Sequence, residues 1–391
     1  MDKKRVAVIF GGISPEHEVS VITGVQVLEN IDTEKFDAFP VYISKTGKFF
    51  TGEALSKIEN YKNLSVVLSK AQEVRPIFGG NIKGFQFSKF GVSKVLPVDV
   101  LFACFHGGLG ENGGFAGLFE LMDLPYTGPG IVAGANGMDK VTMKQIFQQN
   151  GLPVGNYTWF YKSDWENSQE KILEKIAKLV FPLFIKPANC GSSIGVTKAK
   201  NKEELKNAIE VAFVFDRKVL VEEAANGQEI NISVLGNSGK NLETSVCEEV
   251  FHSKDLLSYD DKYLAENGKT PKSSGMASAT RQIPAKIKKE TVVKIEEYAR
   301  VAFEAIDAFG VARIDFIVDE KNGKIVILEA NTIPGSLSFY LWEPAGLNFK
   351  ELTTKLIELA IQRHDDTTIM TKSFSSNILE HANFSGKASK I

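Results

Sequence analysis

Cysteine is scarce in this sequence, with Cys104, Cys190 and Cys247 as the only three among 391 residues. An odd number argues against a disulfide framework, and the wide spacing argues against a zinc site. An excess of one charge sign is also missing, because 46 Lys and Arg oppose 48 Asp and Glu and leave a formal net charge of -2. We therefore expect no nucleic-acid partner and no anionic membrane surface.

Long apolar runs are missing as well. The first apolar run, Val6 to Phe10, is too short for the hydrophobic region of a signal peptide or for a membrane span, so we expect a cytoplasmic protein. The chain is nevertheless longer than one hydrophobic core usually serves, which indicates two or three domains. Short apolar runs alternate with amphipathic segments, and this pattern is typical of an α/β fold with a parallel sheet.

The positions of strands and helices follow from this alternation. Strands are expected at 5–10, 38–43, 98–105, 157–161, 183–186, 194–198, 218–222, 229–235 and 242–250. Helices are expected at 19–30, 115–122, 139–150, 165–179, 202–213, about 285–309, and 349–363. Asn201, followed by Glu204, is a capping signal for the helix at 202–213. The polar tail from His364 onward has no role that we can assign.

Two further strands carry charged residues at their ends. Residues 311–319 alternate apolar and polar, a turn follows, and 324–328 is apolar, which predicts an antiparallel hairpin. Its ends carry Arg313, Asp315, Glu329 and Asn331. Oxygen ligands of this kind suit Mg²⁺, and an arginine beside them can neutralise an oxyanion or a transferred phosphoryl group. The alternative is a solvated hairpin, but Glu329 follows four apolar residues and should begin at the edge of a core.

Two glycine-containing loops follow predicted N-terminal strands. The first, Gly11 to Glu18, lacks the spacing of a dinucleotide fingerprint, and its acids would repel a pyrophosphate, so an acid here suits a substrate ammonium group. Glu18 is the preferred candidate over Glu16, although either acid could simply complement the helix dipole. The second loop offers His106 and Glu111 where open sheets place ligands, and His106 could equally be structural.

A lysine and a loop of small residues stand together in the middle of the chain. Lys186 lies on a predicted strand, and Gly191 to Gly195 follows it. The backbone N–H groups and hydroxyls of such a loop can fold over phosphates while the lysine supplies positive charge, although a flexible hairpin tip is the alternative. Lys140 is a second candidate cation, or an exposed helix lysine. Three acids follow at positions suited to an adenine amine and ribose hydroxyls, namely Glu222, Glu223 and Glu229.

In this order the motifs resemble the ATP-grasp superfamily, and within it the D-alanine–D-alanine ligases of bacterial cell-wall synthesis. The resemblance extends over residues 5 to about 363. It is carried by Gly11-Gly12, Glu16 to Ser20, His106-Gly107, Gly110 to Gly113, Leu124 to Gly128, Met138 to Lys140, Lys186-Pro187, Gly191 to Gly195, Lys262-Tyr263, Arg313 to Asp315, and Glu329 to Gly335.

The resemblance implies a three-domain ATP-grasp fold with an N-terminal open parallel α/β domain. The implied divisions are 1–138, a small central subdomain at 139–228, a catalytic subdomain at 229–363 and the tail at 364–391. It also implies a reaction in which ATP phosphorylates the carboxylate of one D-alanine. The amine of a second D-alanine then attacks the acyl phosphate and gives D-alanyl-D-alanine for peptidoglycan.

The resemblance assigns roles to individual residues. ATP would be bound by Lys140, Lys186, Gly191, Ser192, Ser193, Glu222, Glu223, Ala225 and Glu229. Two Mg²⁺ ions, or Mn²⁺, would be bound by Asp315, Glu329 and Asn331. Arg313 and the Gly335 N–H would form the oxyanion site. Glu18 would bind the first ammonium group and form a hydrogen-bonded triad with Ser192 and Tyr263 that closes the 252–280 loop. Other substrate contacts would come from His106, Glu111, Lys262, Ser338 and Tyr340. Members of the family are commonly homodimers.

The second substrate is the open question. Lys262-Tyr263 implies an amine acceptor, because relatives that use D-lactate lack this pair. The serine expected five residues after the last glycine is replaced by Tyr340, so Ser338 or the Tyr340 hydroxyl would have to bind the second carboxylate. The alternatives are a related ligase that joins D-alanine to D-serine, D-lactate or another acceptor, and a nucleotide-binding module without turnover. The second alternative gives no use to the charged residues of the hairpin.

Overall fold

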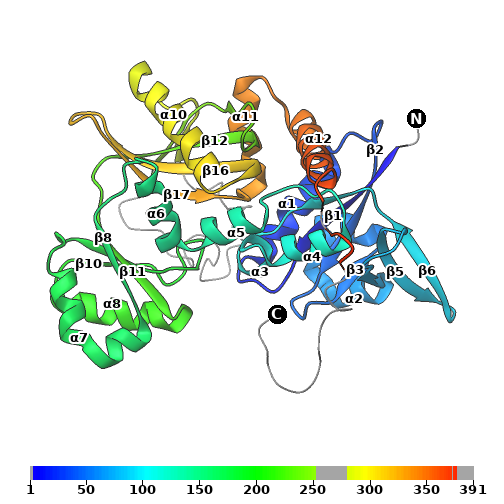
Figure 1. Ribbon diagram of the computed structural model, residues 1–391, viewed down its shortest axis with the longest axis horizontal. Helices are drawn as coiled ribbons and strands as arrows, with labels where there is room; N and C mark the ends of the chain where they lie inside the picture. The colour runs from blue at the N-terminus through cyan, green and yellow to red at the C-terminus, as the bar shows by residue number, and fades with distance from the viewer. Residues whose placement is uncertain (1–2, 252–279, 372, 377–391) are drawn as a thin grey trace.

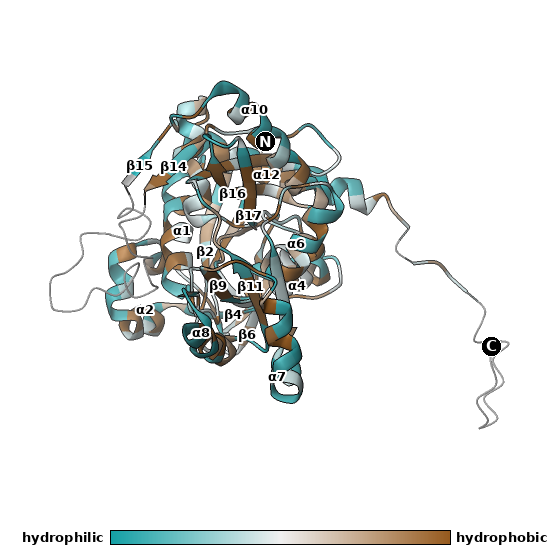
Figure 2. Ribbon diagram, turned by 90° about the vertical axis from the view of Figure 1, so that its left-hand side faces the viewer, coloured by the Kyte–Doolittle hydropathy of each residue, from teal (hydrophilic) through white to brown (hydrophobic). Residues whose placement is uncertain are grey.

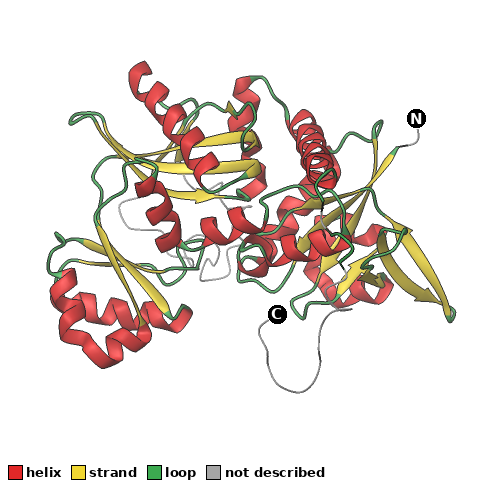
Figure 3. Ribbon diagram, viewed as in Figure 1, coloured by secondary structure: helices red, strands yellow, loops and turns green. Residues whose placement is uncertain are grey.

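A computed structural model of the protein describes residues 3–251, 280–371 and 373–376. The strands in these ranges form three sheets of seven, four and six strands, with helices packed against them (Figure 1, Figure 3). In Figure 2 the apolar residues are concentrated in the strands, and the outer helices carry much of the polar colour. Lys262 and Tyr263 lie outside the described residues. No helix in the described ranges is long and apolar enough to cross a bilayer.

The seven-stranded N-terminal sheet is mixed. Its parallel part consists of β2 (Phe36–Ile43), β1 (Lys4–Gly11) and β7 (Val100–Ala103), all within or near predicted strands. Four antiparallel strands extend this part beyond β2, namely β3 (Phe49–Thr51), β4 (Gln72–Pro76), β5 (Gly84–Lys89) and β6 (Val92–Pro97). The expected open parallel sheet is therefore only part of this region. The sequence does not reveal β5 and β6, because β6 has no buried residue and β5 only two.

Helices connect and cover this sheet. α1 (His17–Asn30) joins β1 to β2 and buries Val21 and Val25, which lie four residues apart on one helical face. The remaining helices of the region are η1 (Glu53–Ser56), η2 (Ile58–Asn63), α2 (Leu64–Lys70), α3 (Gly108–Glu111), α4 (Gly114–Met122) and α5 (Ile131–Met138).

The four-stranded sheet is antiparallel. Its order is β10 (Thr197–Ala199), β9 (Leu183–Pro187), β11 (Lys218–Glu223) and β8 (Tyr157–Tyr161). α7 (Lys162–Ile176) and α8 (Lys202–Phe215) share a core with it. The capping prediction for α8 is confirmed, because the Asn201 side chain accepts hydrogen bonds from the backbone N–H groups of Glu203 and Glu204.

The six-stranded sheet contains the predicted hairpin. β16 (Phe309–Asp319) and β17 (Lys324–Asn331) pair antiparallel, and the sheet continues through β12 (Gln228–Asn237), β14 (Glu248–Phe251) and β15 (Thr280–Gln282). The strand expected at 242–250 is interrupted, because β13 (Glu243–Thr244) and β14 are separate and pair with different parts of β12. α10 (Lys289–Ala305) packs on this sheet and is shorter than expected.

α6 (Lys140–Gln149) connects two of these sheets. Val141 packs with Leu220 of the four-stranded sheet and with Ala188, which directly follows β9, whereas Met143 and Phe147 belong to the core of the six-stranded sheet. The helix therefore places its first residues between the two sheets, and Figure 1 shows α6 below β16 and β17 and above β10 and β11.

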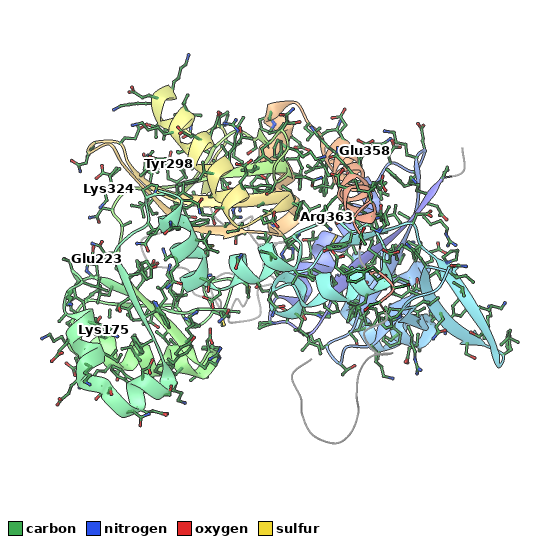
Figure 4. The ribbon with its side chains drawn as sticks, in the orientation of Figure 1. Lys175, Glu223, Tyr298, Lys324, Glu358 and Arg363 are labelled. Atoms are coloured by element: carbon green, nitrogen blue, oxygen red, sulfur yellow. The ribbon has the colours of Figure 1, made fainter. Side chains whose placement is uncertain are left out.

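α12 (Phe349–Thr368) packs on the N-terminal sheet, although its sequence position groups it with the C-terminal strands. Its Leu352, Leu356 and Ile357 belong to the same apolar core as β1 and β7. Arg363, labelled in Figure 4, fixes the helix by donating hydrogen bonds to the Tyr126 and Gly128 carbonyl oxygens at 3.0 and 3.1 Å. The connection from β17 to α12 contains η4 (Gly335–Ser338), α11 (Phe339–Trp342) and η5 (Glu343–Ala345).

Candidate active site

Glu16, and not Glu18, is the N-terminal acid that reaches the small-residue loop. The Ser192 hydroxyl donates a hydrogen bond to Glu16 Oε1. Glu18 is exposed and pairs with Lys45, whose Nζ lies 2.6 Å from Glu18 Oε1. The predicted link between Glu18 and Ser192 is therefore wrong. Residues two apart at the start of a helix point to different sides, so only one of the two acids can face the loop.

Two glycines allow backbone to approach the Glu16 carboxylate closely. Gly107 has a φ of +65°, and a Cβ there would lie 2.6 Å from Glu16 Oε2. A Cβ on Gly191 would lie 2.8 Å from the same oxygen. Any side chain at these positions would displace the carboxylate or the loops. The loops at 107 and 191 therefore enclose Glu16 from two sides.

His106 and Glu111 tie the second N-terminal loop to its surroundings. The buried His106 ring contacts the Thr23 hydroxyl through Nε2 at 2.9 Å, and burial lowers the pKa of His106 to about 4, so the ring is neutral near pH 7. Thr23 also accepts a hydrogen bond from the Ser336 N–H at 3.3 Å. Glu111 accepts from the Gly107 N–H at 2.9 Å, and burial, with Glu16 nearby, raises the pKa of Glu111 to about 7. These contacts bring the segment after Gly335 to the N-terminal loops.

Three lysines meet two acids between the sheets, the buried Glu222 and the half-buried Glu329. Lys140 Nζ lies 2.9 Å from Glu329 Oε2, which joins α6 to the hairpin. Lys186 Nζ lies 2.5 Å from Glu222 Oε1, and Lys144 Nζ lies 2.8 Å from Glu222 Oε2. Burial opposes ionisation of Glu222, but the attraction of Lys144 and Lys186 outweighs it and lowers the pKa of Glu222 to about 2.

Lys144 was not predicted as a site residue. It follows Lys140 by four residues on α6, so both ammonium groups lie on one face of the helix. That spacing is the signal from which it could have been found. Asp139 caps the same helix and pairs with Lys218 Nζ at 2.7 Å, which fixes the position of the helix N-terminus.

The small-residue loop has a strained backbone. Ser192 and Ser193 have φ values of 49° and 60°, in the left-handed region that residues other than glycine rarely adopt. Such strain persists where surrounding contacts hold it, and the hydrogen bond from Ser192 to Glu16 is one of them. The predicted small-residue loop therefore has a defined conformation, and Lys186 lies near the end of the strand that precedes it.

The remaining residues predicted to bind ATP lie around the turn from β11 to β12. Glu222 faces the lysines, whereas the Glu223 carboxylate accepts hydrogen bonds from Asn156 Nδ2 and the Val180 N–H at 2.9 and 3.0 Å. Figure 4 shows Glu223 at the left-hand edge of the molecule. Ala225 lies in the turn, and Glu229 follows at the start of β12.

The hairpin aligns its four candidate site residues across two strands. Arg313 pairs with Asn331 in the register of β16 and β17, and Asp315 pairs with Glu329. Arg313 Nε and Nη2 donate to the two carboxylate oxygens of Asp315 at 2.7 and 2.8 Å, and Asn331 Nδ2 donates to Asp315 Oδ2 at 2.8 Å. Lys140 is the main cause that lowers the pKa of Glu329 to about 2.

This donor set fits a magnesium ion. No three His, Cys, Asp or Glu side chains are grouped for a metal in the ranges that the structure describes. The hairpin instead offers two carboxylates and an amide, and Mg²⁺ commonly takes few protein carboxylates together with substrate phosphate oxygens. Burial raises the pKa of Asp315 to about 6 even though Arg313 is adjacent, and Glu329 adds to the rise. The buried Asp315 carboxyl, with Glu329 beside it, therefore favours additional positive charge at this point.

The two predicted substrate contacts after Gly335, Ser338 and Tyr340, differ in their exposure and in their partners. Ser338 is fully buried, with a relative exposure of 0%, and its hydroxyl has no hydrogen-bond partner among the described residues. Tyr340 is partly exposed, and its hydroxyl lies 3.4 Å from Glu248 Oε1. Arg281, whose guanidinium lies 4.7 Å from the centre of the Tyr340 ring, is the third member of this group. Glu248 and Arg281 were not predicted, because they stand in short strands without a motif.

Comparison with known proteins finds relatives along nearly the whole chain. Residues 5–129 match the family described as D-ala D-ala ligase N-terminus, and residues 146–358 match D-ala D-ala ligase C-terminus. A D-alanine–D-alanine ligase from Acetivibrio thermocellus is 40% identical over 380 residues, which cover 93% of this chain and 98% of the relative. One from Bacillus velezensis is 38% identical over 372 residues, which cover 94% and 100%.

The solved structures with a similar fold also include ligases of D-alanine. The D-alanine–D-alanine ligase from Coxiella burnetii has a TM-score of 0.78 at 26% identity and covers 94% of this chain and 97% of its own. The VanG D-Ala:D-Ser ligase from Enterococcus faecalis has a TM-score of 0.78 at 33% identity and covers 92% and 100%. The expected α/β ATP-grasp fold is confirmed by these likenesses.

Proposed function

The chain belongs to the family of D-alanine–D-alanine ligases, and on this premise we propose that its site joins two D-alanine molecules with conversion of ATP to ADP and phosphate. The product is D-alanyl-D-alanine for peptidoglycan synthesis. One observation supports this activity above all. Polar and charged residues from separate parts of the chain meet at one place. Ser192 contacts Glu16, Lys140 contacts Glu329, and Glu111 lies close enough to both Glu16 and Lys140 for their charges to affect its pKa.

The phosphates of ATP lie over Lys140 and Lys186 in this proposal. Both ammonium groups are already held by carboxylates, Lys140 by the half-buried Glu329 at 2.9 Å and Lys186 by the buried Glu222 at 2.5 Å, so little side-chain entropy remains to be lost on binding. The backbone of Gly191 to Ser193 covers the phosphates from the other side. Glu222, Glu223, Ala225 and Glu229 then line the nucleoside end, on the turn between β11 and β12.

Asp315, Glu329 and Asn331 hold two Mg²⁺ ions in this proposal, with Mn²⁺ as a substitute. When bound, the ions neutralise charge on the phosphoryl group that is transferred. Arg313 lies in register beside the same residues and is held by its two hydrogen bonds to Asp315. Its positive charge is therefore fixed before reaction, which is the condition under which a donor stabilises developing negative charge most effectively.

The first D-alanine binds with its ammonium group toward Glu16, which replaces Glu18 in this role. Its carboxylate oxygen attacks the terminal phosphorus of ATP, and ADP leaves, which gives D-alanyl phosphate. The amine of the second D-alanine attacks the acyl carbon, and the C–O bond to phosphate breaks after the tetrahedral intermediate has formed. Arg313 and the Gly335 N–H hold the oxyanion of that intermediate. His106 positions the segment after Gly335 through Thr23.

A direct assay tests this function. The protein is incubated with D-alanine, ATP and Mg²⁺, phosphate release is followed, and the product is identified by mass. We expect phosphate and D-alanyl-D-alanine in equal amounts, and no phosphate without D-alanine. D-Serine and D-lactate, offered beside D-alanine, identify any other acceptor by product mass. Phosphate release without a dipeptide would reject the ligase assignment.

The proposal also includes the domain boundaries, the oligomeric state and the cellular location of the protein. The three-domain division with boundaries near residues 138 and 228, a homodimer and a cytoplasmic location are expectations of the family. Both family models match this chain, and these matches support the three expectations indirectly. Light scattering of the purified protein tests the dimer, and limited proteolysis tests the boundaries.

A further inference from the structure

The loop that carries Glu16 depends on contacts outside itself for its position. Gly11 and Gly12, with φ values of +92° and +96°, turn the chain at the end of β1. Glu16 is the N-cap residue of α1, but its side chain makes no capping hydrogen bond to the helix. The carboxylate instead accepts a hydrogen bond from Ser192. Other residues must therefore hold the backbone around Glu16 in place.

His17 follows Glu16 and joins the two ends of this loop. Its side chain is buried, with a relative exposure of 3%, so it does not face a substrate. Its Nδ1 lies 2.7 Å from the Gly12 carbonyl oxygen, and its Nε2 lies 3.0 Å from the Tyr42 hydroxyl oxygen. Because a carbonyl oxygen can only accept, Nδ1 carries the proton and donates to Gly12, and Nε2 accepts from Tyr42. The Tyr42 hydroxyl therefore selects the tautomer of His17 that binds Gly12.

Tyr42 is itself held firmly in β2. It has no exposed surface, and its ring contacts those of Phe10 and Tyr61 at centroid distances of 6.1 and 5.6 Å. Burial raises the pKa of Tyr42 to about 12, so the hydroxyl keeps its proton near pH 7 and can donate it. The next residue, Ile43, accepts a hydrogen bond from the Gly12 N–H at 2.7 Å. The end of β2 therefore holds both polar backbone groups of Gly12, one directly and the other through the histidine.

Ser14 holds the loop on the other side of Glu16. Its hydroxyl accepts a hydrogen bond from the Glu16 N–H at 3.0 Å and donates one to the His106 carbonyl oxygen at 2.7 Å. Glu16 therefore stands between two connections, Ser14 before it and His17 after it. A charged hydrogen bond is short and directional, so a small displacement of the carboxylate weakens it. The affinity of Glu16 for an ammonium group thus depends on how firmly these two connections hold the loop.

We propose that His17 and Tyr42 position Glu16 for the ammonium group of the first D-alanine, and so determine the affinity for this substrate without touching it. The inference rests on the proposed ligase function, in which Glu16 receives that group. His17 is a positioning residue, because its ring is enclosed and both of its nitrogens are engaged. Its effect passes through the Gly12 carbonyl to the loop, so it changes where the acid stands and leaves the charge of the acid unaltered.

Tyr42→Phe tests the proposal by removing one hydroxyl while the ring packing is kept. Nε2 of His17 then loses its donor, and the histidine is free to adopt the other tautomer, which cannot donate to Gly12. One net hydrogen bond corresponds to about two- to tenfold in affinity, so the KM for the first D-alanine should rise by this factor. The KM for ATP should stay within about twofold of wild type. Phosphate release over a range of D-alanine and ATP concentrations measures both constants.

A double-mutant cycle with Glu16→Gln separates positioning from a general structural effect. If the hydroxyl acts through the charge of Glu16, Tyr42→Phe should raise the KM for D-alanine in the wild-type background and change it by less than about 1.5-fold in the Glu16→Gln background. A change of equal size in both backgrounds overturns the proposal. His17→Asn, whose amide can still donate to the Gly12 carbonyl, should retain more affinity for D-alanine than His17→Phe, which has no donor. The reverse order also overturns it.

Tyr61→Phe is the matched control. It removes a hydroxyl from the same group of aromatic rings, but this hydroxyl donates to the Leu55 carbonyl oxygen at 2.8 Å. The variant should lower the thermal midpoint as Tyr42→Phe does, because each loses one hydrogen bond, and should leave the KM for D-alanine at its wild-type value. An equal rise of this KM in both variants, or no rise in Tyr42→Phe, overturns the proposal. A wild-type protein that releases no phosphate in response to D-alanine instead overturns the ligase function itself.

Discussion

Ser192 donates a hydrogen bond to Glu16 across 176 positions of the chain. The contact joins the small-residue loop of the four-stranded sheet to the start of α1 on the N-terminal sheet. It places an acid beside the proposed phosphate loop without exposing that acid to solvent, since Glu16 is 9% exposed. In the proposed reaction the N-terminal region therefore contributes a side chain to the substrate site and does not serve only as a support.

The first prediction compares the two acids at the start of α1. Glu16→Gln keeps the shape of the side chain but removes the charge that faces the substrate ammonium group. Loss of a charged hydrogen bond weakens binding by roughly 1.5 to 3 kcal/mol, so kcat/KM for D-alanine should fall by about tenfold or more. Steady-state phosphate release measures this.

Glu18→Gln is the matched control for that variant. Glu18 forms an exposed pair with Lys45, and such pairs contribute little to stability or function. Its kcat/KM should stay within about threefold of wild type, a barrier change of under about 0.7 kcal/mol. A large loss in Glu18→Gln together with an active Glu16→Gln would restore the original sequence prediction.

The contrast between these acids illustrates what the sequence can predict. Lys186, the 191–195 loop and the hairpin could be selected as candidates because their polar residues lie close together in the sequence and next to recognisable strands. The choice between Glu16 and Glu18 depends on a partner far away in the sequence, so local pattern favoured Glu18, whereas Ser192 contacts Glu16. Hydropathy could also not reveal β5 and β6, whose residues are mostly exposed.

The same reasoning applies to the acceptor region. Tyr340 was recognised as a departure from the family pattern, but Glu248 and Arg281, which lie against it in the structure, were not predicted as site residues. Glu248 and Arg281 stand on short strands that reach Tyr340 only through the pairing of β14 with β15. Pairing between short strands is a tertiary property, since strand preference depends on the surrounding packing more than on the residues themselves.

A second prediction concerns acid stability. The pKa of Glu222 is depressed from 4.5 to about 2 because Lys144 and Lys186 outweigh burial. A depressed carboxylate stabilises the fold above its unfolded pKa, and this stabilisation is lost as the pH falls through about 4.5 toward 2. For a shift of this size it amounts to roughly 3 kcal/mol at most.

Glu222→Gln measures that contribution. The gap between the thermal midpoints of wild type and Glu222→Gln should be widest near pH 6 and should narrow steadily toward pH 3. Glu203→Gln, at an exposed position on α8, controls for the loss of one negative charge. A gap that stays constant across this pH range would show that the lysines do not depress the ionisation of Glu222.

The third prediction concerns the proposed metal site. Glu329→Gln preserves shape but removes one of two carboxylate charges, so it should fold normally and lose turnover, with a higher Mg²⁺ concentration required for any residual activity. Titration of activity with Mg²⁺ and with Mn²⁺ measures this. Glu304→Gln, exposed on α10, is the control. Turnover within about threefold of wild type, or under about 0.7 kcal/mol in barrier, would exclude Glu329 from the metal site.

The last prediction concerns Arg313. Arg313→Lys keeps a positive charge but loses the planar fork that now makes two hydrogen bonds to Asp315. A preorganised donor at an oxyanion contributes roughly 3 to 4 kcal/mol, so kcat should fall by about a hundredfold or more while the KM for ATP stays within about threefold. Arg300→Lys, outside the site, should change neither constant. If Arg313→Lys instead raises the KM for ATP and leaves kcat intact, the guanidinium contacts the nucleotide in the ground state, and the stabilisation of the tetrahedral intermediate must come from the Gly335 N–H and other donors. Because Asp315 would keep one of its two bonds to a lysine at 313, the thermal midpoint should fall only slightly, which separates loss of catalysis from loss of fold.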